Sequence, residues 1–315
     1  MRSEPQLSVV IPTWNRRDDL ARTLDVLESH HGPRFEVIVV DNASTDGTAD
    51  MVLDSHPNVR LVQLPRNLGP TGARNVGVAN ARADIIVLLD SDTEPLEGAL
   101  EAIFRRLTDD PRLGAVNALQ IDARTGRPWW WWGPHGYPEA EYLEREFDSA
   151  FKIEEGASGV RRSAYQLAGG FDERFFMLVE GRDLAARVVR TGYSIRYCPE
   201  VRFLHRAESN RPSNNAVYRH SGRLYYEFRN EVWYTWRYFP IRWALLKTAH
   251  NFVTNLRIAL REHAVGAYLR GNFDGLRGLG WVLRHRLPLD TAGLSQVVSR
   301  GNRRWLGRPL EVTSA

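Results

Sequence analysis

The first half of the chain alternates short runs of Val, Ile and Leu with segments whose apolar residues recur every three or four positions. The apolar runs predict buried strands, and the segment after Asp18 predicts a helix because Leu20, Leu24 and Leu27 share one face. A second helix is predicted from about Gly72 to Ala81. The predicted strands are LSVVIPTWN, which ends at Pro12, FEVIVVD, which ends at Asp41, VRLVQL at 59–64 and DIIVLL at 84–89. Near-continuous apolar strands separated by helices indicate an α/β fold, with a mostly parallel sheet flanked by helices.

Polar residues follow three of these strands directly, at the point where each strand ends. Thr13 and Asn15 follow the first, Asp41 and Asn42 follow the second, and the DSD triplet at 90–92 follows the strand at 84–89. In open α/β sheets, ligands bind outside the carboxyl ends of the strands. We therefore expect these side chains to converge on one ligand site.

The second half of the chain has a different pattern. From Asp122 to about Tyr142 the sequence predicts a loop, which contains the four consecutive tryptophans Trp129–Trp132. Two short strands, YSIRYC and VRFLH, are predicted after this loop. From Leu224 onward the residues predict basic, aromatic-rich helices.

Charge divides the chain in a similar way. Residues 1–200 carry 23 Lys and Arg against 31 Asp and Glu, a net charge of −8, whereas residues 201–315 carry 19 against 7, a net charge of +12. We predict a main domain over 1–221 and a C-terminal helical extension over 222–315. A basic extension attracts anionic lipid, a phosphorylated substrate or nucleic acid. Because no nucleic-acid-binding module is recognisable, we predict no nucleic-acid partner.

Cysteine usage and hydropathy bear on the compartment. The single cysteine, Cys198, cannot form an internal disulfide, which fits a reducing compartment. The N-terminal segment lacks the apolar run of a secretory signal, and the longest apolar run, IIVLL at 85–89, is too short to cross a bilayer. We expect a cytoplasmic protein. Peripheral contact at the inner face of the membrane is one interpretation of the C-terminal helices, and helix packing with solvated arginines is the other.

The DSD triplet has a specific chemistry. Carboxylate oxygens are ligands for Mg²⁺ and Mn²⁺, and a cation held by few protein oxygens keeps positions for phosphate oxygens. Acidic turns after strands are also common without any metal. The triplet by itself therefore leaves the metal site and the simple turn as open alternatives.

Six motifs in order resemble the family 2 nucleotide-sugar glycosyltransferases of the GT-A (Rossmann-like) fold, especially the bacterial rhamnosyltransferase-like branch. The resemblance covers about residues 7–240 and identifies the family without identifying the sugar. The motifs are VVIPTWNR, VVDNASTDGT, NLGPTGARNVGV, LLDSDTEP, GGFDERFF and VRFLHRAES. A GT-A fold, a nucleoside-diphosphate sugar donor and a Mn²⁺ or Mg²⁺ cofactor are what this resemblance implies.

The resemblance also implies roles for individual residues. Asp41 accepts a hydrogen bond from the nucleobase, Asp92 binds the metal, and His205 is the distal metal ligand. The donor-binding set that it implies is Thr13, Asn15, Arg16, Asp41, Asn67, Arg74, Asp90 and Ser91. Elementary chemistry agrees, because carboxylates accept from N–H groups of the base and arginine neutralises phosphate. Taken singly, Asp41 is also explained as a turn cap, Arg74 as a solvated helix residue and His205 as a structural histidine.

The catalytic base is the point where the sequence departs from the family. The family carries Glu-Asp-x-Asp-Leu after FF, and the Asp of the Glu-Asp pair is its base. Here the matching residues run from Glu180 to Leu184, and the base position is Gly181. Glu180 can re-aim beside the flexible glycine, Asp183 can serve from the next turn, or the protein binds donor without efficient transfer. We favour Glu180, because Asp183 begins a helix with Arg187 four residues later, which gives it a structural role.

The sequence therefore predicts a metal-dependent, inverting glycosyltransferase. It would transfer a hexose or deoxyhexose from a UDP- or dTDP-sugar to a hydroxyl of a glycan, a lipid-linked or a small-molecule acceptor. A sugar-nucleotide-binding pseudoenzyme is the alternative. Trp129–Trp132 are interpreted as acceptor or lipid contacts, with buried packing as the alternative. The polar segment from Arg206 to Gly222 is predicted to close over bound donor.

Overall fold

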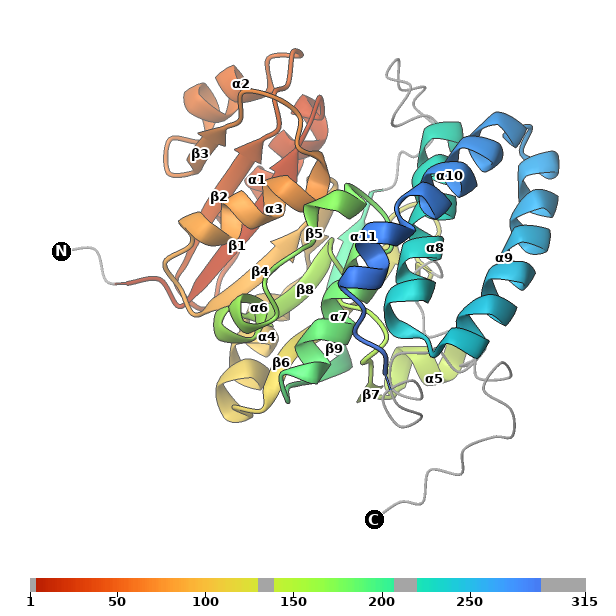
Figure 1. Cartoon of the computed structure of the whole chain (residues 1–315). Coiled ribbons are helices and arrows are strands. Elements are labelled where there is room, and N and C mark those ends of the chain that lie inside the picture. The colour runs from red at the N-terminus through yellow and green to blue at the C-terminus, as the bar shows by residue number, and fades with distance from the viewer. Residues whose placement is uncertain (1–3, 130–138, 207–219, 290–315) are drawn as a thin grey trace. The chain divides into compact units, whose positions relative to one another are not determined.

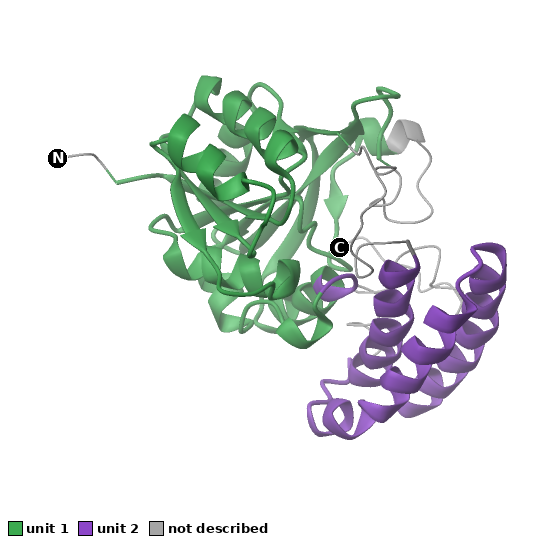
Figure 2. Cartoon of the chain, turned by 90° about the horizontal axis from the view of Figure 1, so that it is seen from above, with its two compact units in different colours: residues 1–176, 181–208 green, residues 177–180, 209–315 purple. Residues whose placement is uncertain are grey.

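A computed structural model describes residues 4–129, 139–206 and 220–289. The chain forms two compact units, which are coloured separately in Figure 2. The first unit contains residues 1–176 and 181–208, and the second contains residues 177–180 and 209–315. Each unit is described by itself.

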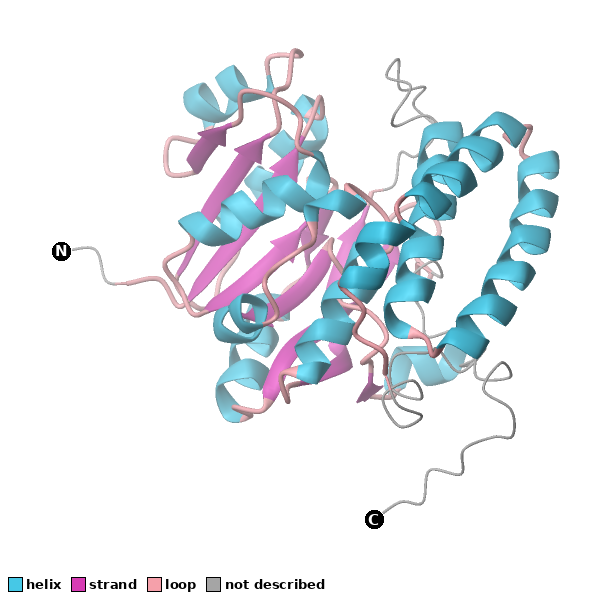
Figure 3. Cartoon of the chain, viewed as in Figure 1, coloured by secondary structure: helices cyan, strands magenta, loops and turns pink. Residues whose placement is uncertain are grey.

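The first unit is built on one mixed sheet with helices on its faces (Figure 1, Figure 3). Within the described residues, the strands are β1 (Leu7–Thr13), β2 (Phe35–Asp41), β3 (Arg60–Gln63), β4 (Ile85–Leu89), β5 (Thr93–Pro95), β6 (Leu113–Asp122), β7 (Phe147–Asp148), β8 (Ala157–Arg161) and β9 (Ser194–His205). Their order is β3-β2-β1-β4-β8-β6-β9-β5, and β7 pairs with β9. The first four strands in this order are mutually parallel, β8 is antiparallel to both of its neighbours, and β6 and β9 are parallel.

The helices of the first unit connect these strands. They are α1 (Arg17–Ser29), α2 (Thr48–Ser55), α3 (Gly69–Asn80), α4 (Ala99–Asp109), α5 (Glu139–Glu144), α6 (Arg162–Leu167), the 3₁₀ turn η2 (Glu173–Phe175) and α7, which runs from Glu180 to Arg190. Pro70 at the start of α3 is well placed, because a first-turn residue needs no N–H for the helix.

Two apolar clusters cover the two faces of the sheet. Val9 and Ile11 of β1 pack in one cluster with Leu20, Leu24 and Leu27 of α1. Val10 of the same strand packs in the other cluster with residues of α3, α6 and α7. Successive side chains of a strand point to opposite faces, so a strand covered on both sides must be apolar throughout. Each fully buried leucine contributes about 2 kcal/mol.

The second unit is helical. It contains α8 (His220–Tyr238), α9 (Ile241–Arg261), α10 (Val265–Arg277) and α11 (Leu279–Arg284). Phe228 of α8 packs with Ala259 of α9 and Ala267 of α10. A Cβ at Gly271 of α10 would lie 2.7 Å from the Tyr225 carbonyl oxygen, so glycine allows α10 to approach the backbone of α8. None of the helices within the described ranges is long and apolar enough to span a membrane.

The predicted α/β class is confirmed, and four of the predicted strands correspond to β1–β4. The helix predicted from about Gly72 begins at Gly69. YSIRYC and VRFLH were expected as two strands, but they form the single strand β9, with a shift in its register to β6 after Cys198. The loop predicted to Tyr142 is wrong at its end, because α5 begins at Glu139. The helical C-terminal region is confirmed.

Candidate active site

The carboxyl ends of β1 and β2 lie side by side because Thr13 and Asp41 are partners in the parallel register. Asn15 joins the loops that follow these strands. Its backbone N–H donates to Ser44 Oγ at 2.9 Å, and its Oδ1 accepts from the N–H of Thr45 at 2.7 Å. The Asp41 carboxylate accepts from the N–H of Ser44 at 3.2 Å, as in a turn cap. The structure thus brings Thr13, Asn15 and Asp41 to one edge of the sheet.

Two asparagines tie the start of α3 to the same edge. Asn42 Nδ2 donates to Asn67 Oδ1 at 2.9 Å, and the same oxygen accepts from the N–H of Gly69 at 2.8 Å. Gly69 has a φ of +74°, and a Cβ there would lie 2.6 Å from the ring of Phe176. Glycine is therefore needed where α3 begins. This network sets the position of Arg74 in the second turn of α3.

Arg74 and Asp90 form an ion pair at the end of β4. Arg74 Nη2 lies 2.5 Å from Asp90 Oδ1, and the guanidinium lies 5.9 Å from the centre of the Phe171 ring. The Arg74 side chain is buried, whereas 38% of the Asp90 side chain is exposed. A buried, charged guanidinium can contact phosphate as well as carboxylate, because both present oxygen pairs to its N–H groups. The interpretation of Arg74 as a solvated helix residue does not fit its burial.

Asp92 and His205 come together through strand pairing. Thr93 of β5 is the antiparallel partner of His205 at the end of β9, so the residue before Thr93 lies beside the histidine. Asp92 Oδ1 lies 3.6 Å from His205 Nε2. The ring of Trp129 packs edge-on against the imidazole, with the ring centres 4.7 Å apart. Arg206, the next residue after the histidine, is held by the carboxylate of Glu94.

The DSD turn is fixed from the side of α1. Thr23 Oγ1 donates to the carbonyl oxygen of the buried Ser91 at 2.9 Å. At the start of the same helix, Arg16 Nη1 lies 3.1 Å from Asp19 Oδ2, and 41% of the Arg16 side chain is exposed. Arg16 is therefore a partly exposed cation at the edge where β1 ends. A negatively charged ligand can reach it without breaking a buried ion pair.

The Asp92 and His205 side chains fit a divalent cation. Burial alone would raise the pKa of Asp92, but the hydrogen bond and positive charge of His205 hold that pKa below its ordinary value. Burial alone would lower the pKa of His205, but Asp92 raises it above the ordinary value. A carboxylate oxygen and an imidazole nitrogen, converging from two strands, are a donor set that Mn²⁺ accepts. Because a metal ligand is a neutral imidazole, a cation bound here would release a proton, and its binding would strengthen as the pH rises.

The acids of α7 have different surroundings. Asp183 is fully buried, and its Oδ2 lies 2.6 Å from Arg187 Nη2. Arg187 also donates to carbonyl oxygens of Ala168 and Gly170, so this ion pair anchors the loop before η2. That geometry favours the structural role of Asp183. Glu180 is buried at the start of the helix, and the residues before it, Leu178 and Val179, have φ of 64° and 69°. A Val with positive φ is a strained residue, and such strain is concentrated at functional sites.

Two further acids, Glu154 and Glu155, were not predicted as site residues. Lys152 Nζ lies 3.2 Å from Glu154 Oε2 and 3.1 Å from Glu155 Oε2. The backbone N–H of Gly181 donates to Glu155 Oε1 at 2.7 Å. The only signal in the sequence is the pair of adjacent acids in KIEEGASGV, directly before a strand of small residues. That signal does not reveal a contact with a residue 26 positions away.

Two predicted features lie mostly outside the described residues. Trp129 is half-buried against His205, but Trp130–Trp132 are outside the described range. Of the segment from Arg206 to Gly222, residues 207–219 are also outside it. The interpretation of these tryptophans and the predicted closure over the donor remain predictions.

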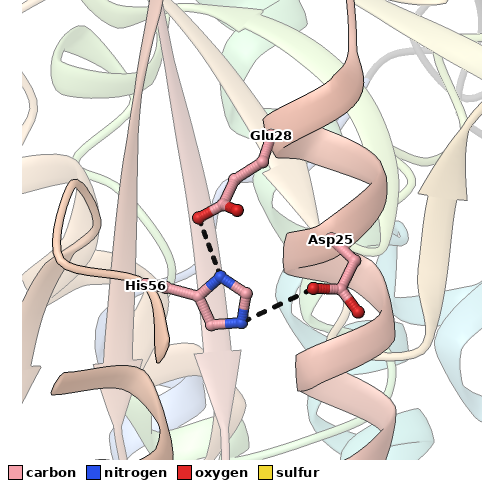
Figure 4. Close-up of side chains that lie close together, drawn as sticks. All are labelled: Asp25, Glu28 and His56. Atoms are coloured by element: carbon pink, nitrogen blue, oxygen red, sulfur yellow. Dashed lines mark hydrogen bonds and ion pairs between the residues drawn. The ribbon is translucent and has the colours of Figure 1, made fainter. Parts of the chain in front are cut away.

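Two other groups of side chains in the described part of the chain have metal-ligand chemistry. In the first, shown in Figure 4, His56 Nδ1 lies 2.8 Å from Glu28 Oε1 and Nε2 lies 3.9 Å from Asp25 Oδ1, so the histidine links α1 to the end of α2. The second contains Cys198, but burial raises the pKa of its thiol to about 12, which keeps it protonated at neutral pH. Neither group includes a residue of the DSD turn.

Comparison with known proteins gives the class of this fold and site. The family "Glycosyl transferase family 2" matches residues 8–167. N-acetylglucosaminyl-diphospho-decaprenol L-rhamnosyltransferase of Mycobacterium tuberculosis is 29% identical, over 82% of this chain and 92% of the relative. Among solved structures, TarS 1-349 of S. aureus in complex with UDP-GlcNAc has a TM-score of 0.62 at 18% identity, covering 93% of this chain and 88% of that one. The mannosyltransferase PcManGT from Pyrobaculum calidifontis, in complex with GDP-Man and Mn²⁺, has a TM-score of 0.55 at 20% identity, covering 90% and 88%.

The chain belongs to glycosyl transferase family 2, because the family match spans half of its residues. The GT-A fold expected from the motifs is confirmed by the arrangement shared with the two structures. The expectation of a glycosyltransferase similar to bacterial rhamnosyltransferases is also confirmed. The assignment of individual site residues remains a prediction.

Proposed function

We propose that this protein transfers a sugar from a UDP- or dTDP-sugar to a hydroxyl group with inversion, in a reaction that depends on a divalent cation. The observation that carries the proposal is the placement of Asp92 and His205 within 3.6 Å of each other, on the sheet edge that also presents Arg74 and Asp90. This edge combines carboxylates, an imidazole and arginines. Arginines bind phosphate directly, and carboxylates bind the divalent cation that accompanies a nucleoside diphosphate. A membership in family 2 supports the same chemistry.

The donor would contact the residues where β1, β2 and β4 end. Asp41 would accept from an N–H of the base, with Thr13, Asn15 and Asn67 beside the nucleoside. Arg16 and Arg74 would contact the diphosphate, and Asp90 with Ser91 would face the ribose or the sugar. A cation held by Asp92 and His205 would neutralise charge on the departing diphosphate.

We propose a lipid-linked glycan as the acceptor. The reason is that the M. tuberculosis relative, which covers 82% of this chain, is named for an N-acetylglucosaminyl-diphospho-decaprenol substrate. In the transfer, the acceptor oxygen forms a bond to the anomeric carbon, and the bond from that carbon to the diphosphate oxygen breaks. The electron pair of the broken bond stays on the diphosphate, and the hydroxyl proton moves to a carboxylate base. Glu180 and Asp183 are the candidates for this base that the sequence singles out.

We expect UDP or dTDP, and their sugars, to raise the melting temperature of the protein in the presence of Mn²⁺ but not with EDTA. A ligand that binds only the folded state at 100 times its dissociation constant adds about 2.7 kcal/mol to stability. The measurement is a thermal-shift panel of UDP-, dTDP- and GDP-sugars, followed by a transfer assay with a short polyprenyl-diphosphate N-acetylglucosamine.

Two results of that panel contradict parts of the proposal. A shift of equal size with EDTA contradicts the role of Asp92 and His205. Donor binding without transfer or donor hydrolysis favours the alternative function, a sugar-nucleotide-binding pseudoenzyme, which the glycine at 181 makes a real competitor.

The helical unit carries an exposed apolar surface that suits a membrane. Six apolar residues of α9 form this surface. They lie along one side of the helix and are each at least 39% exposed: Ile241, Leu245, Leu246, Val253, Leu256 and Leu260. Arg242, Arg257 and Arg261 are exposed on the same helix. Exposed apolar side chains with arginines beside them match an anionic lipid surface, because the chains enter the acyl region and the arginines contact phosphates. We propose peripheral binding of this face of α9 to anionic membranes.

Replacing two of these residues, Leu246→Glu with Leu260→Glu, is expected to lower binding to phosphatidylglycerol vesicles at least 10-fold in a flotation assay. Two carboxylates at the acyl boundary are repelled by the anionic surface and are costly to desolvate. Leu53→Glu is the matched control, because Leu53 on α2 has a similar exposure of 59%. Absence of vesicle binding by the unmodified protein contradicts the proposal. A dimer in solution that Leu246→Glu converts to a monomer also contradicts it, since the face is then a protein interface.

A further inference from the structure

The space beside Gly181 is already filled by another part of the chain. Gly181 is the second residue of α7. A Cβ built at this position would overlap the carbonyl oxygen of Ile153 and Oε1 of Glu155, and it would lie 2.6 Å from the Cδ of Glu155. The volume in which a side chain of residue 181 would begin is therefore occupied by the carboxyl group of Glu155. The resemblance assigns the base of the reaction to this position.

Two donors hold the Glu155 carboxylate in that place. The N–H of Gly181 donates to Oε1 at 2.7 Å, and Lys152 Nζ lies 3.1 Å from Oε2. The first-turn amides of α7 carry partial positive charge, so a negative group is stabilised at the start of this helix. The loop is further fixed by the N–H of Ile153, which donates to the Gly181 carbonyl oxygen at 3.1 Å. The carboxylate is thus held by a backbone N–H at one oxygen and by the Lys152 ammonium group at the other.

The same loop touches Asp90. The N–H of Asp90 donates to the carbonyl oxygen of Gly156 at 3.2 Å, and a Cβ at Gly156 would lie 2.7 Å from Asp90 Cγ. Glu155 is the residue directly before this glycine. The small residue at 156 therefore lets the backbone of this loop approach the carboxylate at the end of β4. The loop that carries Glu155 therefore also contacts the residue at the end of β4.

Glu154 and Glu155 differ in what surrounds their carboxyl groups. Burial raises the pKa of Glu154 to about 8, although Lys152 opposes this shift. Glu155 uses its two oxygens as acceptors from an amide and an ammonium group. Two of the three atoms nearest to a Cβ built at residue 181 belong to the carboxyl group of Glu155.

We propose that Glu155 is the catalytic base of this enzyme, in place of a carboxylate on residue 181, an inference that rests on the proposed transferase function. The acceptor hydroxyl gives its proton to Glu155 Oε2 as its oxygen bonds to the anomeric carbon. The bond to the diphosphate breaks at the same time, and the diphosphate keeps the electron pair. Charge is conserved, because the carboxylate becomes a neutral acid and the diphosphate gains one negative charge.

The test compares four variants of the full-length protein: Glu155→Gln, Glu154→Gln, Glu180→Gln and Asp183→Asn. We expect Glu155→Gln to lower kcat for transfer at least ~10²-fold, with the thermal shift by donor and Mn²⁺ unchanged. Glu154→Gln changes the neighbouring acid, whose carboxyl group is not among the three atoms nearest to a Cβ at residue 181, so we expect turnover within about 3-fold of the wild type. Asp183→Asn is expected to lower the urea midpoint of unfolding, since it removes one partner of a buried ion pair.

A second measurement separates proton transfer from a structural role. Glu155→Ala opens space for a small carboxylate. Added formate is therefore expected to raise the transfer rate of this variant at least 10-fold without changing its unfolding midpoint. Wild-type turnover in Glu155→Gln, or a loss in Glu180→Gln alone, overturns the assignment to Glu155. A wild-type protein that neither binds donor nor transfers sugar overturns the proposed function itself.

Discussion

Asp92→Asn is expected to lower the rate of sugar transfer about 10³-fold, the largest loss of activity for a single side chain at this site. The substitution keeps the size of the side chain but removes the negative charge beside His205, and with it one of the two proposed cation ligands. The departing diphosphate then develops charge without compensation, and a 10³-fold loss corresponds to about 4 kcal/mol of transition-state stabilisation. Initial rates over a Mn²⁺ titration measure the loss.

Asp54→Asn is the matched control for this prediction, because Asp54 is an exposed carboxylate on α2. It is expected to leave the rate and the Mn²⁺ dependence unchanged. The thermal shift produced by UDP or dTDP with Mn²⁺ should disappear in Asp92→Asn and persist in Asp54→Asn. If Asp92→Asn keeps both the nucleotide shift and its Mn²⁺ dependence, Asp92 is not a cation ligand and the DSD motif has only its turn-forming role.

Gly181→Asp, which restores the residue type of the family, is expected to destabilise the protein by about 3 kcal/mol and to yield no gain in transfer. The new Cβ would meet the Ile153 carbonyl oxygen, which is backbone and cannot rotate away as a side chain can. The new carboxylate would also lie against that of Glu155, and two close carboxylates cannot both stay ionised without cost. Urea unfolding and the transfer assay measure the two effects.

Gly266→Asp provides the control for helix position and charge. Gly266 is likewise the second residue of its helix, α10, and nothing lies within 4 Å of a Cβ built there. We expect a change within about 0.5 kcal/mol. If Gly181→Asp is as stable as the wild type and more active, the loop at 153–155 moves aside, and Glu155 is not the base. Activity that arises only in Gly181→Asp would identify the natural protein as a pseudoenzyme.

Much of the first unit could be read from the sequence, and the reason is burial on both faces of the sheet. β1 and β2 each have four Val, Ile or Leu among seven residues, and β4 has no other residue type, because α1 and α4 cover one face while α3, α6 and α7 cover the other. A strand of that kind has an unambiguous pattern. β5 and β8 lack such a pattern. TEP has only three residues and ASGVR consists largely of small residues, so both strands depend on pairing with neighbouring strands.

The donor edge was predictable for a related reason. In parallel strands the carboxyl ends align, so polar residues that follow β1, β2 and β4 must meet, and this follows from the sequence once the strands are recognised. The pairing of Asp92 with His205 did not follow from periodicity, because it depends on the antiparallel register of β5 with β9 across more than a hundred residues. The prediction that Asp92 and His205 act together came from the family resemblance.

By itself, the sequence determined the α/β class, the positions of the first four strands along the chain and the polar residues that follow them. It also showed the glycine at position 181, where the family has an acid. Only the tertiary structure decided which group occupies the space beside Gly181. The carboxyl group of Glu155 reaches position 181 because the loop before β8 packs its backbone against the first turn of α7. The contact joins residues 26 positions apart, and no local pattern of polar and apolar residues encodes a distance of that kind. It depends on which elements the sheet places next to each other, and on the missing side chain that leaves room between them.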